Sequence, residues 1–440
     1  MVDLTFRMID RMAERVASSV SFSFPGQPEE VLPDHIDHAG LNIRVPFCAF
    51  RCTYCALPGE RFSAKSADHF VSALNKEIEL YAARYERAKI ERIYLSGGTP
   101  SLLYESIGGI VDEVKKHFEF KGPVSMEASP VDLDDHVLDG LRSGGVNQLS
   151  IGIQTFNEEI LSRYLNRKVT QADLIETLKR VRESKFDYIN IDLMFSLPFQ
   201  TKESLLHDLE IAVSTGVDGI STYPLMLLPY TPLASKILLN QNRAQKAHIS
   251  SLHGFSQNPA TEMDQYLLIL SFLRQHGYQI RTIWSFSKAP EKYEGPYEHS
   301  NFIGMGPRAW GMLGNRFTLN MPSVLPYADA IAGGKFPIFA FSAVRDYPLA
   351  RFARKLYHGK ITVDEIEMIN EQDQGIKRYL LMMKLLGLIK RKRDYYELTD
   401  KALAYGSCAT KKIASATLIK INEVFASFDQ PKTMTFSPTA

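Results

Sequence analysis

Short apolar runs alternate with longer amphipathic stretches from residue 41 onward, and this alternation restricts the chain to few folds. The apolar runs are Leu41 to Val45, Arg92 to Leu95, Val124 to Glu127, Gln148 to Ile153, Tyr188 to Met194 and Gly219 to Tyr223. Helical periodicity lies between them, over Ala67 to Tyr85, Leu133 to Ser143, Thr170 to Ser184 and Lys202 to Thr215. This order is typical of βα units that build a parallel sheet. Six such units are too few for a closed eight-stranded barrel, so we expect an α/β fold with an open, partial (β/α)6 barrel.

Further regions are expected on both sides of this barrel. They are an N-terminal extension over residues 1–40, the barrel over 41–232, a region that completes the barrel and the substrate site over 233–346, a mostly helical region over 347–430 and a tail over 431–440. In the helical region a basic run, Lys390 to Arg393, separates a helix from a strand-like stretch, and this order resembles a winged helix. Such a unit also occurs as a packing lid, an interpretation we favour over DNA binding.

The charge balance argues against a general attraction to nucleic acid or to an anionic membrane. The chain has 51 basic and 50 acidic residues and a formal net charge of +1. No apolar run reaches about 18 residues, and charged side chains interrupt the N-terminal segment. We therefore expect a cytoplasmic protein that uses neither a membrane nor nucleic acid as a partner.

Three of the four cysteines lie close together. Cys48, Cys52 and Cys55 follow the first predicted strand, a spacing that suits metal ligation better than a disulfide framework. Three thiolates can hold three irons of a four-iron cluster and leave the fourth iron open to a small molecule. A structural zinc would need a fourth ligand, for which the sequence offers His35, His38 or Cys408. We favour the cluster over zinc and over simple core packing.

The segment CAFRCTYC, with Tyr54 just before the third cysteine, resembles the cluster loop of the radical S-adenosylmethionine superfamily. This resemblance implies a [4Fe–4S] cluster whose open iron binds S-adenosylmethionine, which one electron then cleaves to methionine and a 5′-deoxyadenosyl radical. The second predicted strand ends in Gly97, Gly98 and Thr99, which resemble the Gly-Gly stretch of that superfamily. There the absent side chains let the backbone approach the methionine amino group.

More of the chain is similar to one subgroup, the oxygen-independent coproporphyrinogen III oxidase-like proteins. The similar segments are IRVPFC, YLSGGTPSLL, SIGIQTFNEEILSRYLNR, INIDLMFSLPFQT and IGMGPRAWG. By this resemblance Glu127, Gln154, Arg167 and Asp192 correspond to polar positions around the ribose, methionine and sulfonium parts of S-adenosylmethionine. An arginine suits the methionine carboxylate, and carboxylates suit hydroxyl groups or a cation. No residue is assigned as a catalytic acid or base.

Three positions depart from the oxidase pattern. The oxidase has LYVHIPFC, so its Tyr and His are replaced by Asn42 and Arg44, and its fourth nearby cysteine is replaced by Leu57. These changes argue against decarboxylation of coproporphyrinogen. Among the subgroup's other members we favour the methyltransferases and cyclopropane-forming enzymes, in which a second S-adenosylmethionine supplies a methylene radical. An oxidase-like porphyrin or heme enzyme and a heme chaperone remain the alternatives.

The expected partners follow from this hypothesis. They are a small, ring-containing substrate and a reductase, flavodoxin or ferredoxin that donates electrons. Aromatic residues that could line a pocket for a flat substrate are Tyr223, Tyr230, Trp284, Phe286, Tyr293, Tyr297 and Trp310.

Overall fold

The computed structural model describes residues 4–86, 88–237, 258–292, 301–373 and 375–428. Its centre is a run of parallel strands in the order β9-β8-β7-β6-β4-β1. Their bounds are His38–Val45 (β1), Lys89–Gly97 (β4), Val124–Ala128 (β6), Gln148–Gln154 (β7), Tyr188–Phe195 (β8) and Gly219–Pro224 (β9). These strands are the six predicted ones, and the expected α/β partial barrel is confirmed.

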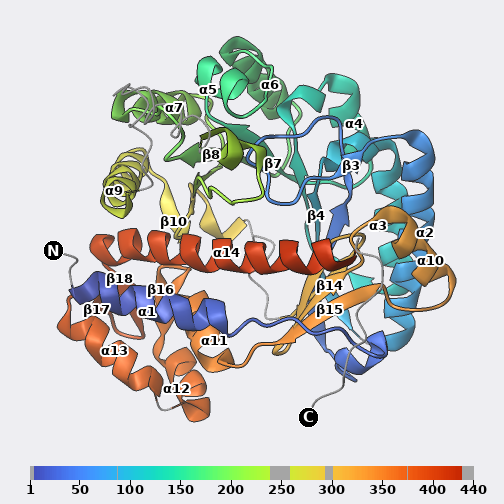
Figure 1. Ribbon diagram of the computed structural model, residues 1–440. Coiled ribbons are helices and arrows are strands. Elements are labelled where there is room, and N and C mark those ends of the chain that lie inside the picture. The colour runs from blue at the N-terminus through green and yellow to red at the C-terminus, as the bar shows by residue number, and fades with distance from the viewer. Residues whose placement is uncertain (1–3, 87, 238–257, 293–300, 374, 429–440) are drawn as a thin grey trace.

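Helices cover the outer face of this sheet (Figure 1). They are α2 (Ala64–Arg84), α3 (Tyr104–His117), α4 (Asp135–Ser143), α5 (Glu158–Arg163), α6 (Gln171–Glu183) and α7 (Lys202–Ser214). Their starts are set by local chemistry, since Thr170 and Thr201 each form a capping box at the first turn of α6 and α7. Each helix then buries an apolar stripe, which in α6 includes Leu174, Leu178 and Val181.

The sheet continues beyond the parallel strands at both edges. On one side β1 pairs in parallel with β12 (Phe302–Met305), and the antiparallel strands β13 (Trp310–Leu313), β14 (Arg316–Asn320) and β15 (Ile338–Ala343) follow. On the other side β9 pairs with β11 (Ser285–Ser287), which pairs with β10 (Gln279–Thr282). Short pairs join β2 (Phe47–Cys48) to β3 (Glu60–Arg61) and β5 (Glu119–Phe120) to β4. Helices α9 (Pro259–Gln275) and α10 (Val324–Ala332) complete this part.

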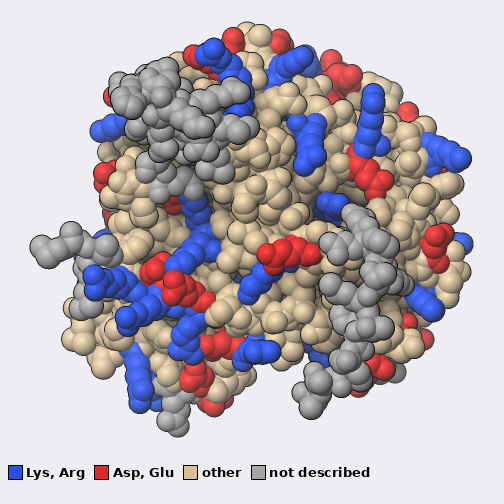
Figure 2. Space-filling view, in the orientation of Figure 1, with Lys and Arg blue, Asp and Glu red and all other residues tan. Residues whose placement is uncertain are grey.

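The N-terminal and C-terminal segments pack on each other. Helix α14 (Asp400–Phe428) crosses the front of the molecule with α1 (Leu4–Ser18) beside it (Figure 1). Lys412 of α14 pairs with Asp10 and Glu14 of α1. Figure 2 shows basic and acidic side chains interspersed over this layer. The predicted extension is therefore part of the folded body.

The C-terminal region has the elements of a winged helix. Helices α11 (Tyr347–Leu356), α12 (Val363–Gln372) and α13 (Gly375–Leu385) accompany a small sheet of β16 (Lys360–Thr362), β18 (Tyr395–Leu398) and β17 (Ile389–Arg391). The predicted tail over 431–440 lies outside the described residues. Within the described residues, none of the helices is both long and apolar enough to cross a membrane.

Candidate active site

The three clustered cysteines lie on one loop at the carboxyl end of β1. All three are free and partly exposed. The short pairing of β2 with β3 closes the base of this loop. Its tip is held by Thr53, whose main-chain N–H donates to Leu165 O at 3.4 Å, and by Asn166, whose side chain donates to Arg51 O at 2.8 Å. The loop is therefore fixed against the segment that follows β7.

The backbone of Gly98 and of Gly59 passes close to Phe47 and Cys48. A Cβ on Gly98 would lie 2.1 Å from Phe47 O and 3.0 Å from the Cys48 Sγ, and a Cβ on Gly59 would lie 2.9 Å from the same sulfur. Gly97 has φ of +117°, a backbone conformation that side chains disfavour. The absence of side chains at these glycines therefore leaves space beside the cysteine thiols.

A cavity of about 270 Å³ opens above the loop. The residues predicted from the sequence all line it, namely Cys48, Cys52, Tyr54, Cys55, Gly97, Gly98, Thr99, Glu127, Gln154, Arg167 and Asp192. They come from the cysteine loop and from the ends of β4, β6, β7 and β8, together with the segment after α5. The carboxyl edge of a parallel sheet thus brings distant residues to one place.

Two carboxylates occupy the inner wall of this cavity. Glu127 accepts hydrogen bonds from Gly97 N at 3.3 Å and from Tyr94 OH at 3.2 Å, and burial raises its pKa. Asp192 accepts from Ser150 Oγ and from Asn190 Nδ2, both at 3.1 Å. Burial, followed by the charge of Glu127, raises the pKa of Asp192 to about 7. Neither group forms an ion pair with another of the described residues, so a ligand with hydroxyl groups or positive charge suits them.

Arg167 supplies positive charge on the opposite side. Its side chain is buried, with Nη2 donating to Gly152 O at 2.8 Å and Nη1 reaching Tyr54 OH at 3.5 Å. Its Nε has no hydrogen-bond partner among the described atoms. Burial raises the pKa of the Cys52 thiol, and the Arg167 charge opposes that shift. The arginine is therefore placed to favour thiolate and carboxylate groups in the cavity.

The three thiols do not lie close enough together for a single zinc ion. The Zn–S distance is about 2.3 Å, so thiolates on one zinc lie within about 4.6 Å of one another. The three Sγ atoms do not form a group within 4.8 Å in the part of the chain that the structure describes. His35 pairs with Asp37 and His38 pairs with Glu91, and His38 is the first residue of β1, at the opposite end of that strand from the cysteine loop.

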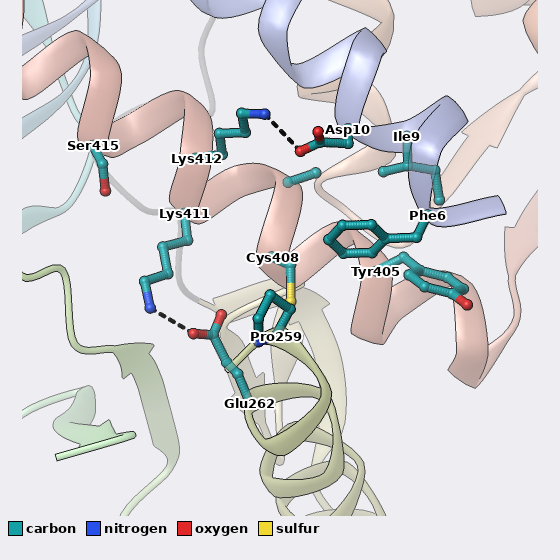
Figure 3. Close-up of a pocket in the computed structure, with 11 residues that line it drawn as sticks. Phe6, Ile9, Asp10, Pro259, Glu262, Tyr405, Cys408, Lys411, Lys412 and Ser415 are labelled. Atoms are coloured by element: carbon teal, nitrogen blue, oxygen red, sulfur yellow. Dashed lines mark hydrogen bonds and ion pairs between the residues drawn. The ribbon is translucent and has the colours of Figure 1, made fainter. Parts of the chain in front are cut away.

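The fourth cysteine lies in a different place. Cys408 sits on α14 near Phe6 and Glu262, and Lys411 pairs with Glu262 beside it (Figure 3). Burial and the charge of Glu262 raise the pKa of the Cys408 thiol to about 12. Cys408 is therefore a partly exposed thiol that does not line the cavity above the cysteine loop.

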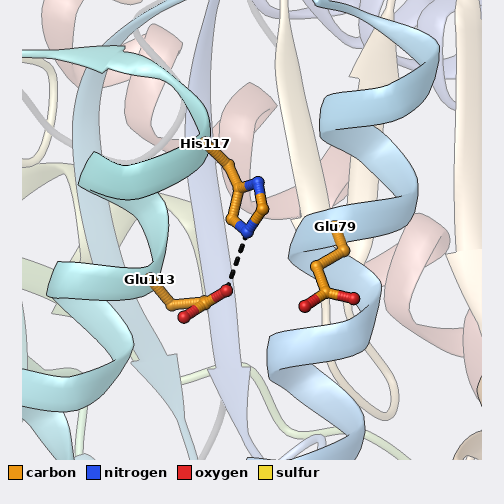
Figure 4. Close-up of side chains that lie close together, drawn as sticks. All are labelled: Glu79, Glu113 and His117. Atoms are coloured by element: carbon orange, nitrogen blue, oxygen red, sulfur yellow. Dashed lines mark hydrogen bonds and ion pairs between the residues drawn. The ribbon is translucent and has the colours of Figure 1, made fainter.

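One close group of potential metal ligands does occur on the described surface. Glu79 of α2 faces Glu113 and His117 of α3 (Figure 4). Glu113 already pairs with His117 at 2.8 Å and with Lys116 at 3.0 Å. These contacts account for the group as a surface ion-pair network.

Sequence reasoning missed Ser150 and the role of Arg44. Ser150 lines the cavity because it shares the inner face of β7 with Gly152 and Gln154, and this period of two was visible in the sequence. Arg44 is buried, and its Nη2 donates to Leu57 O at 2.7 Å. No sequence pattern signals that contact, because it joins a strand to an irregular loop.

The predicted aromatic run does not line a single pocket. Tyr223 and Trp284 line a second cavity, whereas Phe286 is buried in the main core. Tyr230 donates to Leu418 O at 3.2 Å, and Trp310 packs in a separate apolar cluster with Leu57. Tyr293 and Tyr297 lie outside the described residues.

Comparison with known proteins agrees with this geometry. The profile of the radical SAM superfamily matches residues 42–212. The heme chaperone HemW of Bacillus subtilis is 32% identical over 302 residues, which cover 67% of this chain and 76% of that protein. The chain belongs to the radical SAM superfamily. The oxygen-independent coproporphyrinogen III oxidase of Escherichia coli is 28% identical over 311 residues, 66% of this chain and 65% of that protein.

The fold of this radical SAM protein also has a close solved counterpart. The structure of the coproporphyrinogen III oxidase HemN from Escherichia coli superposes with a TM-score of 0.70 at 22% identity. The match covers 90% of this chain and 94% of that one. The shared fold therefore extends over most of the chain, including the helical C-terminal region.

Proposed function

We propose that this radical SAM protein binds S-adenosylmethionine in the cavity above the cysteine loop and cleaves it reductively. The observation that carries the proposal is the convergence of three thiols, Gly97, Gly98 and the side chains of Glu127, Gln154, Arg167 and Asp192 on one cavity of about 270 Å³. Cys48, Cys52 and Cys55 would hold a [4Fe–4S] cluster. Once reduced by an electron donor, such a cluster would supply the one electron needed to break the sulfonium carbon–sulfur bond, which would give methionine and the 5′-deoxyadenosyl radical.

The protein's own residues position the nucleoside. The backbone at Gly97 and Gly98 accommodates the methionine amino group, because no side chain blocks the approach. Arg167 is suited to the methionine carboxylate, and Glu127 and Asp192 to the ribose hydroxyls and the sulfonium charge. Gln154, at φ of 74°, ends β7 in a conformation that turns the chain at the cavity rim.

The test is anaerobic reconstitution with iron and sulfide, followed by reductant and S-adenosylmethionine. We expect 5′-deoxyadenosine and methionine in equal amounts. The matched control is the triple variant Cys48→Ala, Cys52→Ala, Cys55→Ala, which should form neither. Native protein that carries a full cluster and yet releases no 5′-deoxyadenosine with any reductant would refute the cleavage and leave a binding role.

For the molecule acted upon, we propose a tetrapyrrole or heme. This proposal is supported by the relatives, one a heme chaperone and the other a coproporphyrinogen III oxidase. It replaces methylene transfer as our first choice. Soret titration with heme and product analysis with coproporphyrinogen III separate a carrier from an oxidase, since only the oxidase converts substrate while 5′-deoxyadenosine accumulates.

Methylene transfer from a second S-adenosylmethionine remains a second candidate. It is kept because Asn42 and Arg44 replace the Tyr and His of the oxidase pattern. Asn42 is buried and accepts from Ser96 Oγ at 2.7 Å, while Arg44 contacts Leu57. Deuterium-labelled methyl groups test this candidate. Label in 5′-deoxyadenosine together with S-adenosylhomocysteine would support it, and their absence during turnover would exclude it. Both proposals require an electron donor, for which we propose a reductase, a flavodoxin or a ferredoxin.

A further inference from the structure

A second cavity, of about 410 Å³, lies beside the barrel. Its walls come from the end of β9 and the β10–β11 hairpin on one side, and from α11, α14 and α1 on the other. Figure 1 shows α14 and α1 running across this side of the sheet. The volume falls within the range of about 300–1,000 Å³ that small-molecule sites usually have.

Three aromatic rings form one wall of this second cavity. The rings of Tyr223 and Trp284 lie 5.8 Å apart at 73°, and those of Trp284 and Tyr357 lie 6.0 Å apart at 88°. Trp284 Nε1 donates to the buried Ser407 Oγ at 2.9 Å, which fixes the indole. Rigid rings set at right angles to each other offer both faces and edges to a planar ligand.

Two of the side chains that line the second cavity are positively charged, those of Arg281 and Arg354. Arg281, Arg354 and His358 line it, and none of the described residues lining it is Asp or Glu. Burial, with the charges of Arg281 and Lys355, lowers the pKa of His358 to about 4. Burial also lowers the pKa of Arg354. The charged side chains that line the cavity are therefore two arginines, and a carboxylate on a ligand suits them.

A hydrogen-bonded row of side chains connects the second cavity to the S-adenosylmethionine site. Asn190 Nδ2 donates to Ser150 Oγ at 2.8 Å, and Ser150 lines the first cavity. Ser221 Oγ reaches Asn190 Oδ1 at 3.3 Å and Ser285 Oγ at 3.1 Å, and Ser285 lines the second cavity. The two cavities thus share the inner face of β7, β8, β9 and β11.

We propose that the second cavity binds a planar, ring-containing molecule through at least one carboxylate, with the rings against Trp284 and the carboxylate at Arg354 and Arg281. This inference rests on the proposed function only in placing the ligand beside the S-adenosylmethionine site. Arginine is suited to the role because its planar fork binds a carboxylate through two hydrogen bonds.

The test uses reconstituted full-length protein and coproporphyrin III as the probe. The chain has two tryptophans, so the Trp310→Phe protein reports on Trp284 alone. We expect saturable quenching of Trp284 emission. Arg354→Gln should weaken binding about tenfold, as the loss of one charge-assisted hydrogen bond does, and Arg281→Gln should do the same. Arg354→Lys should recover part of the affinity.

Two controls make the result specific. Arg351→Gln lies on the same helix, but its guanidinium contacts Met368 and the Tyr347 ring outside the cavity, so it should bind the probe like the native chain. The tetramethyl ester of the probe should bind weakly and equally to the native and Arg354→Gln proteins. Equal affinity of acid and ester, unchanged binding in both Arg354→Gln and Arg281→Gln, or no quenching at all would overturn the inference.

The outcome is independent of the cleavage reaction. Formation of 5′-deoxyadenosine in the absence of probe reports on the cysteine cavity, and it should persist in Arg354→Gln. Loss of probe binding with cleavage intact supports the cationic cavity. Probe binding in a protein that never cleaves S-adenosylmethionine would keep the cavity assignment and refute the proposed function.

Discussion

The guanidinium of Arg44 donates a hydrogen bond from Nη2 to the main-chain oxygen of Leu57, at 2.7 Å. These two residues stand where the oxidase pattern has a histidine and a fourth cysteine, so two departures in the sequence form one contact in the structure. The Arg44 charge also lowers the pKa of Cys55 and Glu127, in each case against a larger effect of burial. A buried positive charge is thus built in beside the cysteine loop.

This charge should tune the reduction potential of a cluster on that loop. Positive charge favours the reduced form, so Arg44→Gln should lower the midpoint potential by roughly 60 mV, the one-electron equivalent of a tenfold change. A potentiometric titration followed by electron paramagnetic resonance measures the shift. Arg44→Lys should retain most of the native potential. Arg51→Gln, on the exposed part of the same loop, is the control, and an equal shift there would mean that Arg44 has no special effect.

Substitution of the loop cysteines and substitution of Cys408 should have opposite effects on the iron content of the protein. The triple variant Cys48→Ala, Cys52→Ala, Cys55→Ala should lose the brown chromophore, because no thiolates remain on the loop. Cys408→Ala should keep full iron and sulfide, since that thiol lies on α14 near Glu262. Iron analysis and visible absorbance decide the matter, and a full cluster in the triple variant would show that the ligands were assigned wrongly.

The six parallel strands were predictable because they depend on local pattern, whereas the polar residues of the candidate site were predicted from the resemblance of their segments to a known family. Apolar runs mark buried strands, and residues at strand ends meet at one edge whatever lies between them. The added strands β12 to β15 and the packing of α1 on α14 were not predictable. They depend on contacts between distant parts of the chain, such as Ser23 with Phe341, for which no short-range signal exists. The second cavity has the same origin, since its walls combine α1, the barrel edge and α14.

Removal of Arg167 should weaken S-adenosylmethionine binding by about 2 kcal/mol, the usual cost of losing a charge-assisted contact. The iron content of Arg167→Ala should not change, because the arginine is not a cysteine ligand. Isothermal titration under anaerobic conditions gives the affinity. Arg163→Ala is a matched control, since that arginine is exposed and paired with Glu159. If Arg167→Ala and Asp192→Ala both bind S-adenosylmethionine normally, these residues lie outside the binding site.

A buried carboxylate, Glu77 of α2, joins the barrel to its added strands. It accepts hydrogen bonds from Gly306 N at 2.8 Å, Tyr327 OH at 2.6 Å and Asn320 Nδ2 at 3.1 Å. Burial raises its pKa from 4.5 to about 7, although these three donors oppose the shift. The folded protein therefore binds a proton at Glu77 at pH values where the unfolded chain has released it.

This shift makes the stability of the protein depend on pH in a defined direction. Between about pH 4.5 and 7 the folded state holds more protons than the unfolded state, so the contribution of Glu77 to the free energy of unfolding falls as pH rises.

The side chain of the Glu77→Gln variant cannot titrate. The variant should be less stable than the native chain at about pH 5, and its relative stability should improve by about 3 kcal/mol by about pH 8. Urea denaturation at the two pH values measures this difference. Asp68→Asn, at an exposed position of the same helix, removes a carboxylate without touching the buried network, and its relative stability should be the same at both pH values. A Glu77→Gln difference that is also independent of pH would show that Glu77 stays ionised in the folded protein.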